Sequence, residues 1–500
     1  MRSRPGPEAV DPARVAWPSP SAVMRHPRMT WPGPMSLLFG LWILILTDVH
    51  WFIASFAGSP VLRIVTIGFV ALLVTLLAGL SRASWQRRFT PYAPFLLYAI
   101  SSLPMILFAE NTGFARTGAK TLFLWWIFIV GTVVMVDSAR RAELLLRIYG
   151  LHFLWWAVWA GPKAVIGWHH SLDNHDAIGA FMVGGLSMSF FLFMAAPPGT
   201  KFRKAMLVSS FLCVMVVVAS YARGAFLAAV AVYGIMWLRS PRKGLTLMAG
   251  VGMALVVVVA AVLIFPAGFF YNEIMSAFAE GTTSGTGEDR MVLWTVGWEV
   301  FKTHPLFGVG MGNVGAYGST IFQPGELGAD YYFNPGLLYG RALHNIYVTT
   351  LAEQGLLGSI AFLWVIADFW RRNRHLRSGK YDAAWNALGG RLSLKQVALG
   401  LELGMASVLI TAVLYPMLNI HFWFTLLTLN LMLHRMVTSP PEPVRKHRPD
   451  PRAQPLKPLT ASSIALRQRA ERVGARGRPT VRNGVSFRYW LVASHRSKCT

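Results

Sequence analysis

Cysteine and acidic residues are scarce in this chain. Only Cys213 and Cys499 occur among 500 residues, which excludes the disulfide framework that holds small secreted proteins together. Asp and Glu number 22, and all charged residues make up 14% of the chain. Because a soluble globular protein carries about 25% charged residues, this composition argues against a water-soluble enzyme.

Apolar residues are abundant in this chain. Hydrophobic residues make up 54% of it, and the mean hydropathy is +0.45. Apolar runs recur at roughly 17 to 25 residues, the length that an α-helix needs to cross a bilayer. The sequence therefore predicts an all-α polytopic membrane protein with about twelve transmembrane helices. The predicted spans are 35–57, 61–80, 92–109, 121–137, 143–162, 177–196, 204–220, 224–238, 244–270, 345–370, 397–416 and 419–437.

Lys and Arg gather in every second loop between these spans. Since cationic loops are retained in the cytoplasm, this alternation predicts that both termini are cytoplasmic. Residues 1–34 are proline-rich and lack the small-residue cleavage site of a signal peptide, so we expect the first span to stay as an anchor. The cationic loop residues are Arg82, Arg87 and Arg88; Arg140 and Arg141; Lys201, Arg203 and Lys204; Arg239, Arg242 and Lys243; and RRNRHLRSGK with Arg391 and Lys395.

The spans divide the chain into five segments. A cytoplasmic segment, 1–34, precedes nine spans in 35–270; one long extracytoplasmic loop, 271–344, separates these from three more spans in 345–437. The tail, 438–500, holds 14 Lys and Arg against 3 Asp and Glu. We predict that it is disordered, cytoplasmic and attracted to anionic membrane lipids. It contains no base-reading motif, so we expect no nucleic-acid partner.

The long extracytoplasmic loop is the place where we expect chemistry. It reverses the charge balance, with seven acidic residues against Arg290, Lys302 and Arg341. GEDRMVLWTVGWEVFKT predicts an amphipathic helix that carries Trp294 and Trp298 on one face and ends near Pro305. GVGMGNVGAYG follows and predicts a loop. Its G-x-G-x-x-G match lacks the flanking strand and helix of a dinucleotide site, so we interpret it as a loop that permits close backbone approach.

Two arginines stand where the positive-inside bias disfavours them. Arg223, in ASYARGAF, lies in an external hairpin between the seventh and eighth spans. It either pairs with lipid phosphate or recognises an anion, because a guanidinium group matches phosphate oxygens in two places at once. Arg290 follows Glu288 and Asp289, so it either pairs with these carboxylates or points into a cleft above the membrane.

The stretch RALHNIYVTTLAEQGLLG places Arg341 and His344 just before the tenth span. A histidine that is neutral near pH 7 can accept a proton from an attacking hydroxyl, although an interfacial histidine bonded to backbone is the plainer interpretation. Arg341 is either an interfacial anchor or a further anion contact. Glu353 lies nine residues beyond His344, on the opposite face of a helix, and is expected to pack or pair rather than to catalyse.

WHHSLDNHDA concentrates polar residues in one external loop. His169, His170, Asp173, His175 and Asp176 could suit zinc or manganese, but their spacing matches no common zinc pattern. We therefore predict no metal site. Asn174, His175 and Asp176 are instead candidates for contact with an acceptor or a sugar.

Three motifs together resemble the O-antigen ligase and O-antigen polymerase superfamily of bacterial surface-glycan assembly. They are SYARGAFLA, then R-x3-W with HPLFGVGMGNV, and then HNIYVTTLAEQGLLG. The resemblance covers roughly residues 170–375 and rests on the order of the motifs as well as on their letters.

The resemblance implies an inverting, metal-independent glycosyltransferase with a GT-C-like helical fold and no cofactor, in the bacterial inner membrane. It implies an undecaprenyl-diphosphate-linked glycan as donor and a glycan, lipid-core or protein acceptor. By position, Arg223 and Arg290 match the family's two arginines and His344 its histidine. In this hypothesis the arginines bind the leaving diphosphate and His344 deprotonates the acceptor hydroxyl. Arg341 is a third candidate contact to the diphosphate, without an equally firm family counterpart.

Two rival classes fit parts of the same sequence. A polytopic secondary transporter or a lipid-linked glycan flippase would carry out no covalent chemistry, but such proteins often contain repeats joined near the middle, and none is evident here. A metal-dependent transferase would need carboxylates in the early external loops, and the loop FAGSP after the first span has none.

Overall fold

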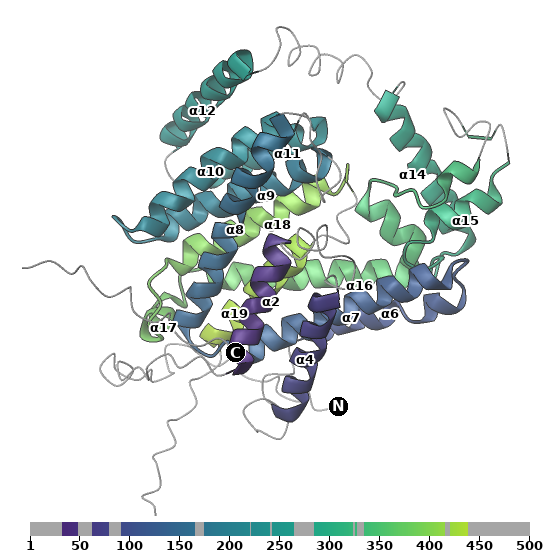
Figure 1. Cartoon of the computed structure of the whole chain (residues 1–500), viewed down its shortest axis with the longest axis horizontal. Coiled ribbons are helices and arrows are strands. Elements are labelled where there is room, and N and C mark those ends of the chain that lie inside the picture. The colour runs from purple at the N-terminus through teal and green to yellow at the C-terminus, as the bar shows by residue number, and fades with distance from the viewer. Residues whose placement is uncertain are drawn as a thin grey trace, which may run out of the picture. The chain divides into compact units, whose positions relative to one another are not determined.

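The computed structural model describes residues 33–48, 63–79, 92–165, 175–220, 222–240, 243–264, 285–323, 326–327, 335–415 and 421–438. In these ranges all regular secondary structure is helical and no strand occurs, which confirms the all-α prediction (Figure 1). The predicted disordered tail, 438–500, lies outside the described residues except for Thr438, and so does the N-terminal segment up to residue 32.

The helices follow the predicted spans closely. They are α2 (Gly33–Thr47), α4 (Arg63–Gly79), α6 (Ala93–Ser101), η3 (Pro104–Leu107), α7 (Thr112–Met135), α8 (Ala139–Val165), α9 (His175–Ala195), α10 (Lys201–Ala219), α11 (Arg223–Arg239), α12 (Lys243–Ile264), α14 (Gly285–Thr303), α15 (Val314–Ile321), η5 (Pro335–Leu338), α16 (Ile346–Arg377), α17 (Asp382–Ala387), α18 (Leu394–Thr411) and α19 (His421–Thr438).

Five of the described helices are long and apolar enough to cross a membrane. They lie in α7, α9, α10, α16 and α18, and four shorter apolar helices fall at other predicted spans. The chain is therefore a polytopic membrane protein by length and composition, while the number twelve remains a prediction.

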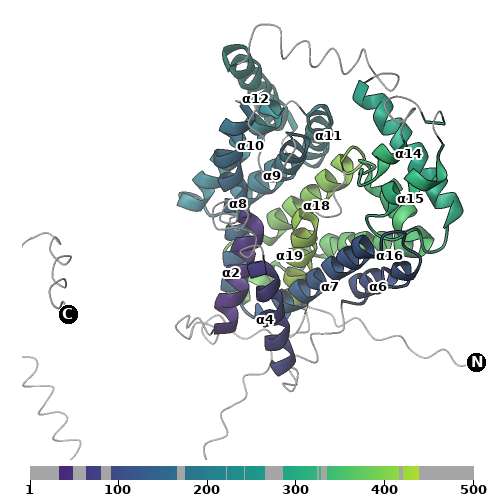
Figure 2. The same cartoon turned by 45° about the vertical axis from the view of Figure 1, so that its right-hand side comes forward.

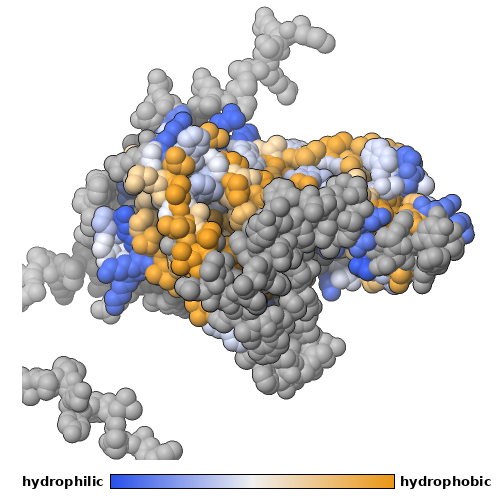
Figure 3. Space-filling model, turned by 90° about the horizontal axis from the view of Figure 1, so that it is seen from above, coloured by the Kyte–Doolittle hydropathy of each residue, from blue (hydrophilic) through white to orange (hydrophobic). Residues whose placement is uncertain are grey.

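The surface agrees with this assignment. Large apolar side chains stand exposed on helices that would face lipid, among them Ile67 (64% exposed), Leu255 (64%) and Ile360 (61%). Figure 3 shows apolar residues covering much of the described surface on one face, with hydrophilic residues gathered toward its margins. A soluble protein rarely leaves such an area uncovered.

Helix α9 packs along α8, α10, α11 and α18, and Figures 1 and 2 show these helices as neighbours. Serine pairs reinforce the packing. The hydroxyls of Ser189 and Ser209 lie 2.8 Å apart between α9 and α10, and those of Ser187 and Ser407 lie 3.3 Å apart between α9 and α18. Small hydroxyl residues let two membrane helices approach closely, and their side chains form hydrogen bonds across the contact between the helices.

Several predicted boundaries were wrong. Helix α16 runs to Arg377 rather than to 370, and α18 ends at Thr411 rather than at 416. Helix α7 begins at Thr112 rather than at 121, because the Asn111 side chain accepts hydrogen bonds from the amides of Gly113 and Phe114 and so caps the helix. The predicted span 92–109 is divided into α6 and the short helix η3, with Pro104 as the first residue of η3.

The helix ends that carry cationic loops meet at one end of the bundle. The Ser393 amide donates to the Ala195 carbonyl (3.0 Å), which joins the start of α18 to the end of α9. Arg239 at the end of α11 and Arg377 at the end of α16 each lie 3.1 Å from the buried Glu402 carboxylate of α18. The ends of α9, α11 and α16, whose loops were predicted to share one side of the membrane, therefore lie on one side of the fold, while Arg82, Arg87 and Arg88 lie outside the described residues.

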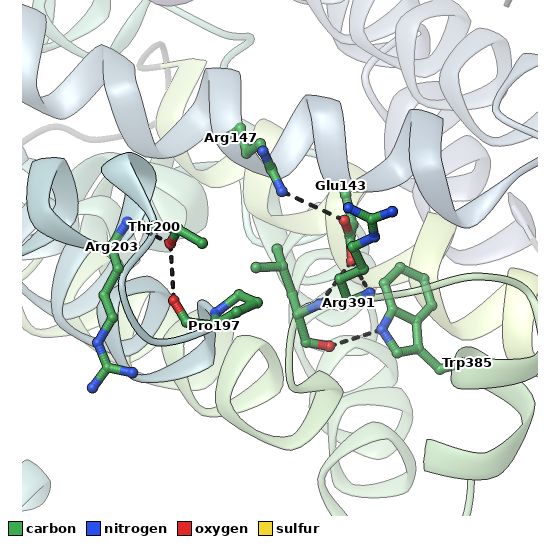
Figure 4. Close-up of polar contacts among 8 residues, drawn as sticks. Glu143, Arg147, Pro197, Thr200, Arg203, Trp385 and Arg391 are labelled. Atoms are coloured by element: carbon green, nitrogen blue, oxygen red, sulfur yellow. Dashed lines mark hydrogen bonds and ion pairs between the residues drawn. The ribbon is translucent and has the colours of Figure 1, made fainter.

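A second polar junction lies at this basic end (Figure 4). The buried Glu143 carboxylate of α8 accepts hydrogen bonds from the backbone amides of Arg391 and Leu392, the latter at 2.7 Å. Trp385 donates its indole N–H to the Leu392 carbonyl (2.8 Å), and Arg147 lies 3.8 Å from Glu143. One carboxylate thus fixes the segment between α17 and α18 against α8.

Replacing Glu143 by alanine is expected to lower the thermal stability of the protein. The change leaves two backbone amides without their acceptor, at a cost of about 1–3 kcal/mol for each amide that stays buried. Glu299→Ala is the matched control, because Glu299 is 39% exposed and lies on the surface beside Lys302, in an ion pair worth at most about 1 kcal/mol. Equal melting temperatures for the two variants in detergent would contradict this account of the junction.

The segment between α12 and α16 has a core of its own. Helices α14 and α15 pack against each other and against α16, as Figure 1 shows. The core face of α14 carries Leu293, Val296 and Val300, whereas Trp298 is 52% exposed and Trp294 is half-buried, so neither tryptophan belongs to this apolar cluster. Ala352 of α16 belongs to the same cluster, which attaches it to the spanning helix. Its members are Leu293, Val296, Val300, Val309, Val314, Leu327, Leu338, Leu343 and Ala352.

Candidate functional site

Helix α16 is broken near its start. Gly355 has φ 62° and ψ −163°, a conformation outside the helical region, so the hydrogen-bond ladder of α16 is interrupted there. The loop 305–310 fills the gap. Four hydrogen bonds join the two: Val309 N to Ala352 O (3.1 Å), Gly310 N to Glu353 O (2.9 Å), Leu356 N to Pro305 O (2.8 Å) and Leu357 N to Leu306 O (3.2 Å). We call residues 305–310 and 352–357 the helix-break junction.

The junction provides hydrogen-bond partners for backbone groups of α16 that would be costly to leave unpaired in a membrane. An interrupted helix leaves carbonyls and amides without partners, and each such group in hydrocarbon costs several kcal/mol. Here the loop supplies both donors and acceptors. The motifs HPLFGVG and AEQGLLG, which lie far apart in the sequence, are therefore two halves of one structure.

Glycine is required on both sides of the junction. A Cβ on Gly308 would collide with the backbone of Glu353 and Gln354, and a Cβ on Gly355 would collide with the Leu306 carbonyl and the Phe307 amide. Both glycines also have positive φ. The prediction that the glycine loop permits close backbone approach is confirmed. The prediction that all of GVGMGNVGAYG is loop was wrong in its second half, because α15 begins at Val314.

Glu353 strengthens the junction from inside α16. Its side chain is buried, and its carboxylate lies near the backbone amides of Gly312 and Val314 at the start of α15. Negative charge is favourable at a helix N-terminus, where amides lack partners within the helix. Glu353 is therefore buried near these backbone amides, in agreement with the expectation that it would pack or pair.

His344 lies where α14, α16 and α18 meet. The preceding carbonyl, of Leu343, accepts the indole N–H of Trp294 at 3.0 Å. The residue after it, Asn345, caps α16 through bonds from the amides of Tyr347 and Val348. With both flanking residues held, the half-buried imidazole has little freedom to move away.

The backbone of His344 is itself unusual. Its φ is +50°, and among the described residues other than glycine only Asp48 shares a positive φ. Such a conformation costs of the order of 1–3 kcal/mol and persists where surrounding contacts impose it. The ring centre of Tyr415, just beyond α18, lies 6.3 Å from that of His344.

Arg290 lies on α14 one helical turn before Trp294, and is half-buried. Trp294 donates to the Leu343 carbonyl, which is next to His344 in the chain. Residues four apart share one face of a helix, so Arg290 and Trp294 lie on the same face of α14.

Arg223 is the first residue of α11, and the placement of its side chain lies outside the described structure. The position of its backbone shows which helices lie beside the start of α11. A Cβ on the next residue, Gly224, would lie 3.0 Å from Leu414, the neighbour of Tyr415. The Ile346 amide at the start of α16 donates to the Ala412 carbonyl at 2.8 Å. The start of α11 and the start of α16 therefore both meet the end of α18.

Arg341 is exposed, and its amide donates to the Leu338 carbonyl at 2.9 Å in the turn after η5. Its backbone is packed against α15, since a Cβ on Gly315 would meet the Arg341 backbone. The structure places it three residues from His344 in a fixed turn.

The loop 168–177 is mostly outside the description. His169, His170, Asp173 and Asn174 lie outside the described residues, and for His175 and Asp176 only the backbone at the start of α9 is described. That start lies at the Arg223 end of the bundle, because Gly179 one turn on is packed against Ala222 and Ala225. Within the described residues no three His, Cys, Asp or Glu side chains gather as metal ligands.

Comparison with known proteins agrees with the motifs. A family model described as O-antigen ligase matches residues 208–363, and a search of curated proteins finds no match. The matched segment contains Arg223, Arg290, Arg341 and His344 as well as the whole helix-break junction. The resemblance predicted from the three motifs is thereby confirmed: residues 208–363 are similar to the O-antigen ligase family.

Proposed function

We propose that this protein is an inverting glycosyltransferase of the bacterial inner membrane. It moves a glycan from an undecaprenyl-diphosphate carrier to an acceptor hydroxyl on the extracytoplasmic side, with both termini in the cytoplasm. Two observations support the proposal: the match of residues 208–363 to the O-antigen ligase family model, and the hydrogen bond from Trp294, one turn after Arg290, to the Leu343 carbonyl next to His344.

The chemistry follows from these side chains. The acceptor oxygen attacks the anomeric carbon from the face opposite the diphosphate, while the bond from that carbon to the diphosphate oxygen breaks. The leaving diphosphate keeps the electron pair, and the cationic groups of Arg223, Arg290 and Arg341 stabilise its charge. The imidazole of His344 takes the proton of the hydroxyl.

The proposal includes a GT-C-like arrangement in which the lipid donor enters from the bilayer. Helices α14 and α15 are joined to the spanning helix α16 through the helix-break junction, so a reaction centre beside the start of α16 lies near the membrane. The three cations supply charge of the kind that Mg²⁺ provides in other transferases, which motivates the proposal of metal independence. A transporter or flippase remains the alternative, and it predicts no release of lipid diphosphate.

The test is a transfer assay in EDTA with the purified full-length protein and lipid-diphosphate-linked glycan and acceptors extracted from the source cells. Wild type is expected to stay active, and Arg290→Gln to lose about 10²–10³-fold in kcat, as removal of one preorganised charge donor does elsewhere. Lys302→Gln on the same helix is the control, because Lys302 is 52% exposed and pairs with Glu299 at 2.7 Å. Loss of wild-type activity in EDTA, or equal kcat for the two variants, would overturn the proposal.

A further inference from the structure

Tyr339 is a fixed aromatic ring on the outside of the protein. It lies two residues before Arg341 and five before His344, and it is 56% exposed. Its hydroxyl accepts a hydrogen bond from the Asn111 side-chain amide at 3.0 Å. Its ring centre lies 6.1 Å from that of Phe114, at a tilt of 48°. We call Tyr339 and Phe114 the aromatic platform.

The anchor of the platform is itself held firmly. Asn111 and Asn313 bond to each other twice: the Asn111 amide donates to the Asn313 side-chain oxygen (2.6 Å), and the Asn313 side-chain nitrogen donates to the Asn111 carbonyl (3.1 Å). Asn313 is fully buried. Because Asn111 also caps α7, this asparagine pair ties Tyr339 to the start of α7 and to the loop before α15.

Folding alone does not explain why this ring is fixed. An exposed ring buries little apolar area, and ordering a side chain costs conformational entropy. For binding the arrangement is favourable, since a tyrosine held in advance offers a broad, rigid surface at little further entropic cost.

The chemistry of the surface indicates what it binds. Its hydroxyl oxygen accepts from Asn111, which leaves the aromatic face and the O–H donor for a ligand, with the exposed Arg341 two residues away in the chain. A pyranose ring is complementary to this combination, because it has an apolar face of C–H groups and hydroxyls around its edge that accept hydrogen bonds from a guanidinium group.

We infer that the aromatic platform is a sugar-binding subsite, on which one ring of the glycan stacks close to His344. The inference rests on the proposed function and deepens it, because it names a place where the glycan itself is recognised, apart from the diphosphate. The sugar ring belongs either to the donor glycan or to the acceptor glycan, and transfer kinetics separate the two.

The first test measures binding without transfer. The probe is the surface polysaccharide of the source cells, freed of lipid and diphosphate by mild acid, and the readout is its Kd for the full-length protein in detergent. Tyr339→Ala is expected to weaken binding about tenfold, the order of one well-formed aromatic contact with its buried area. Tyr339→Phe is expected to keep most of the affinity, since the ring remains. Trp298→Ala is the control, because Trp298 is an exposed aromatic residue on α14.

Tyr339→Leu separates a sugar ligand from a lipid one. A leucine keeps apolar volume but has no aromatic face, so sugar stacking predicts that it binds as weakly as the alanine variant. If Tyr339→Leu binds the polysaccharide as tightly as wild type does, the residue has a lipid-facing role and the inference is overturned. An unchanged Kd for Tyr339→Ala relative to Trp298→Ala would overturn it as well.

The second test uses the transfer assay. Tyr339→Ala is expected to raise KM while kcat changes little, for the donor if the ring belongs to the donor and for the acceptor otherwise. If wild type transfers glycan and Tyr339→Ala has the same KM as wild type for both substrates, the aromatic platform does not bind the sugar, and the proposed function stands. If wild type transfers nothing but glycan binding still depends on Tyr339, the proposed function is wrong and the subsite stands.

Discussion

Replacing His344 by asparagine is expected to lower kcat for glycan transfer by about 10²–10⁴-fold, the usual effect of removing a general base. The fold is expected to survive. Asparagine is among the few residues that adopt positive φ readily, and His344 has φ +50°. Its flanking contacts, through Leu343 and Asn345, involve backbone and the neighbouring side chain rather than the imidazole.

The same backbone conformation makes a sharper experiment possible. Glycine suits φ +50° better than histidine does, so His344→Gly removes the imidazole without adding strain. Added imidazole is expected to restore part of the lost activity, whereas furan, a ring of the same size without a basic nitrogen, is not. Full activity of His344→Gly without any additive would remove this histidine from the mechanism.

Replacing Gly355 by alanine is expected to be strongly destabilising. Its φ of 62° and ψ of −163° lie in a region that is essentially restricted to glycine, which costs an alanine about 1–3 kcal/mol. The added Cβ would also collide with the Leu306 carbonyl and the Phe307 amide, so the loop would have to leave the helix-break junction. Four junction hydrogen bonds depend on that contact.

Two other glycines separate the effect of backbone strain from the effect of the steric clash. Gly340 has φ 75°, but no heavy atom lies within 4 Å of the position that a Cβ would take, so Gly340→Ala tests backbone strain alone. Gly234, in the middle of α11, has open space and ordinary φ, so Gly234→Ala is expected to be neutral or slightly stabilising. Thermal unfolding in detergent should rank the variants Gly234→Ala, Gly340→Ala and Gly355→Ala from most to least stable. A Gly355→Ala protein as stable as Gly340→Ala would contradict the packing of the junction.

Hydropathy was a good guide to the helices of the bundle. Helices α9, α10 and α11 begin and end within about three residues of their predicted spans, because their length and apolar content are set by the bilayer. Hydropathy did not predict a helix boundary that depends on a single residue. Asn111 starts α7 at Thr112 rather than at 121 through its capping bonds, and nothing in the apolar pattern marks that.

The break in α16 could not be predicted from its own sequence. AEQGLLG is typical of a continuous helical run, since a single glycine is tolerated in a helix at a cost of about 1 kcal/mol. What breaks the helix is the loop 305–310, which bonds to both sides of Gly355 from a distant part of the chain. The glycines of GVGMG were the available signal, because glycine is common where two backbones approach closely.

The motifs pointed to Arg290 and His344, and both stay predicted site residues. The structure adds a contact between their neighbours, since Trp294 donates to the Leu343 carbonyl. The pairing of Asn111 with Asn313 and the exposed ring of Tyr339 could not be predicted, because single asparagine and tyrosine residues have no spacing in the sequence that marks their contacts. The roles of all predicted site residues stay predictions: His344, Arg223, Arg290, Arg341, Asn174, His175 and Asp176.

The most direct test of the proposed transfer is its stoichiometry. Purified protein, lipid-diphosphate-linked glycan and acceptor are incubated together, and the lipid diphosphate released is counted against the glycan joined to the acceptor. The proposal predicts equal amounts of the two, no release without acceptor, and loss of both products in His344→Asn. Movement of the intact lipid-linked glycan across vesicle membranes without any release of lipid diphosphate would contradict it and identify a transporter instead.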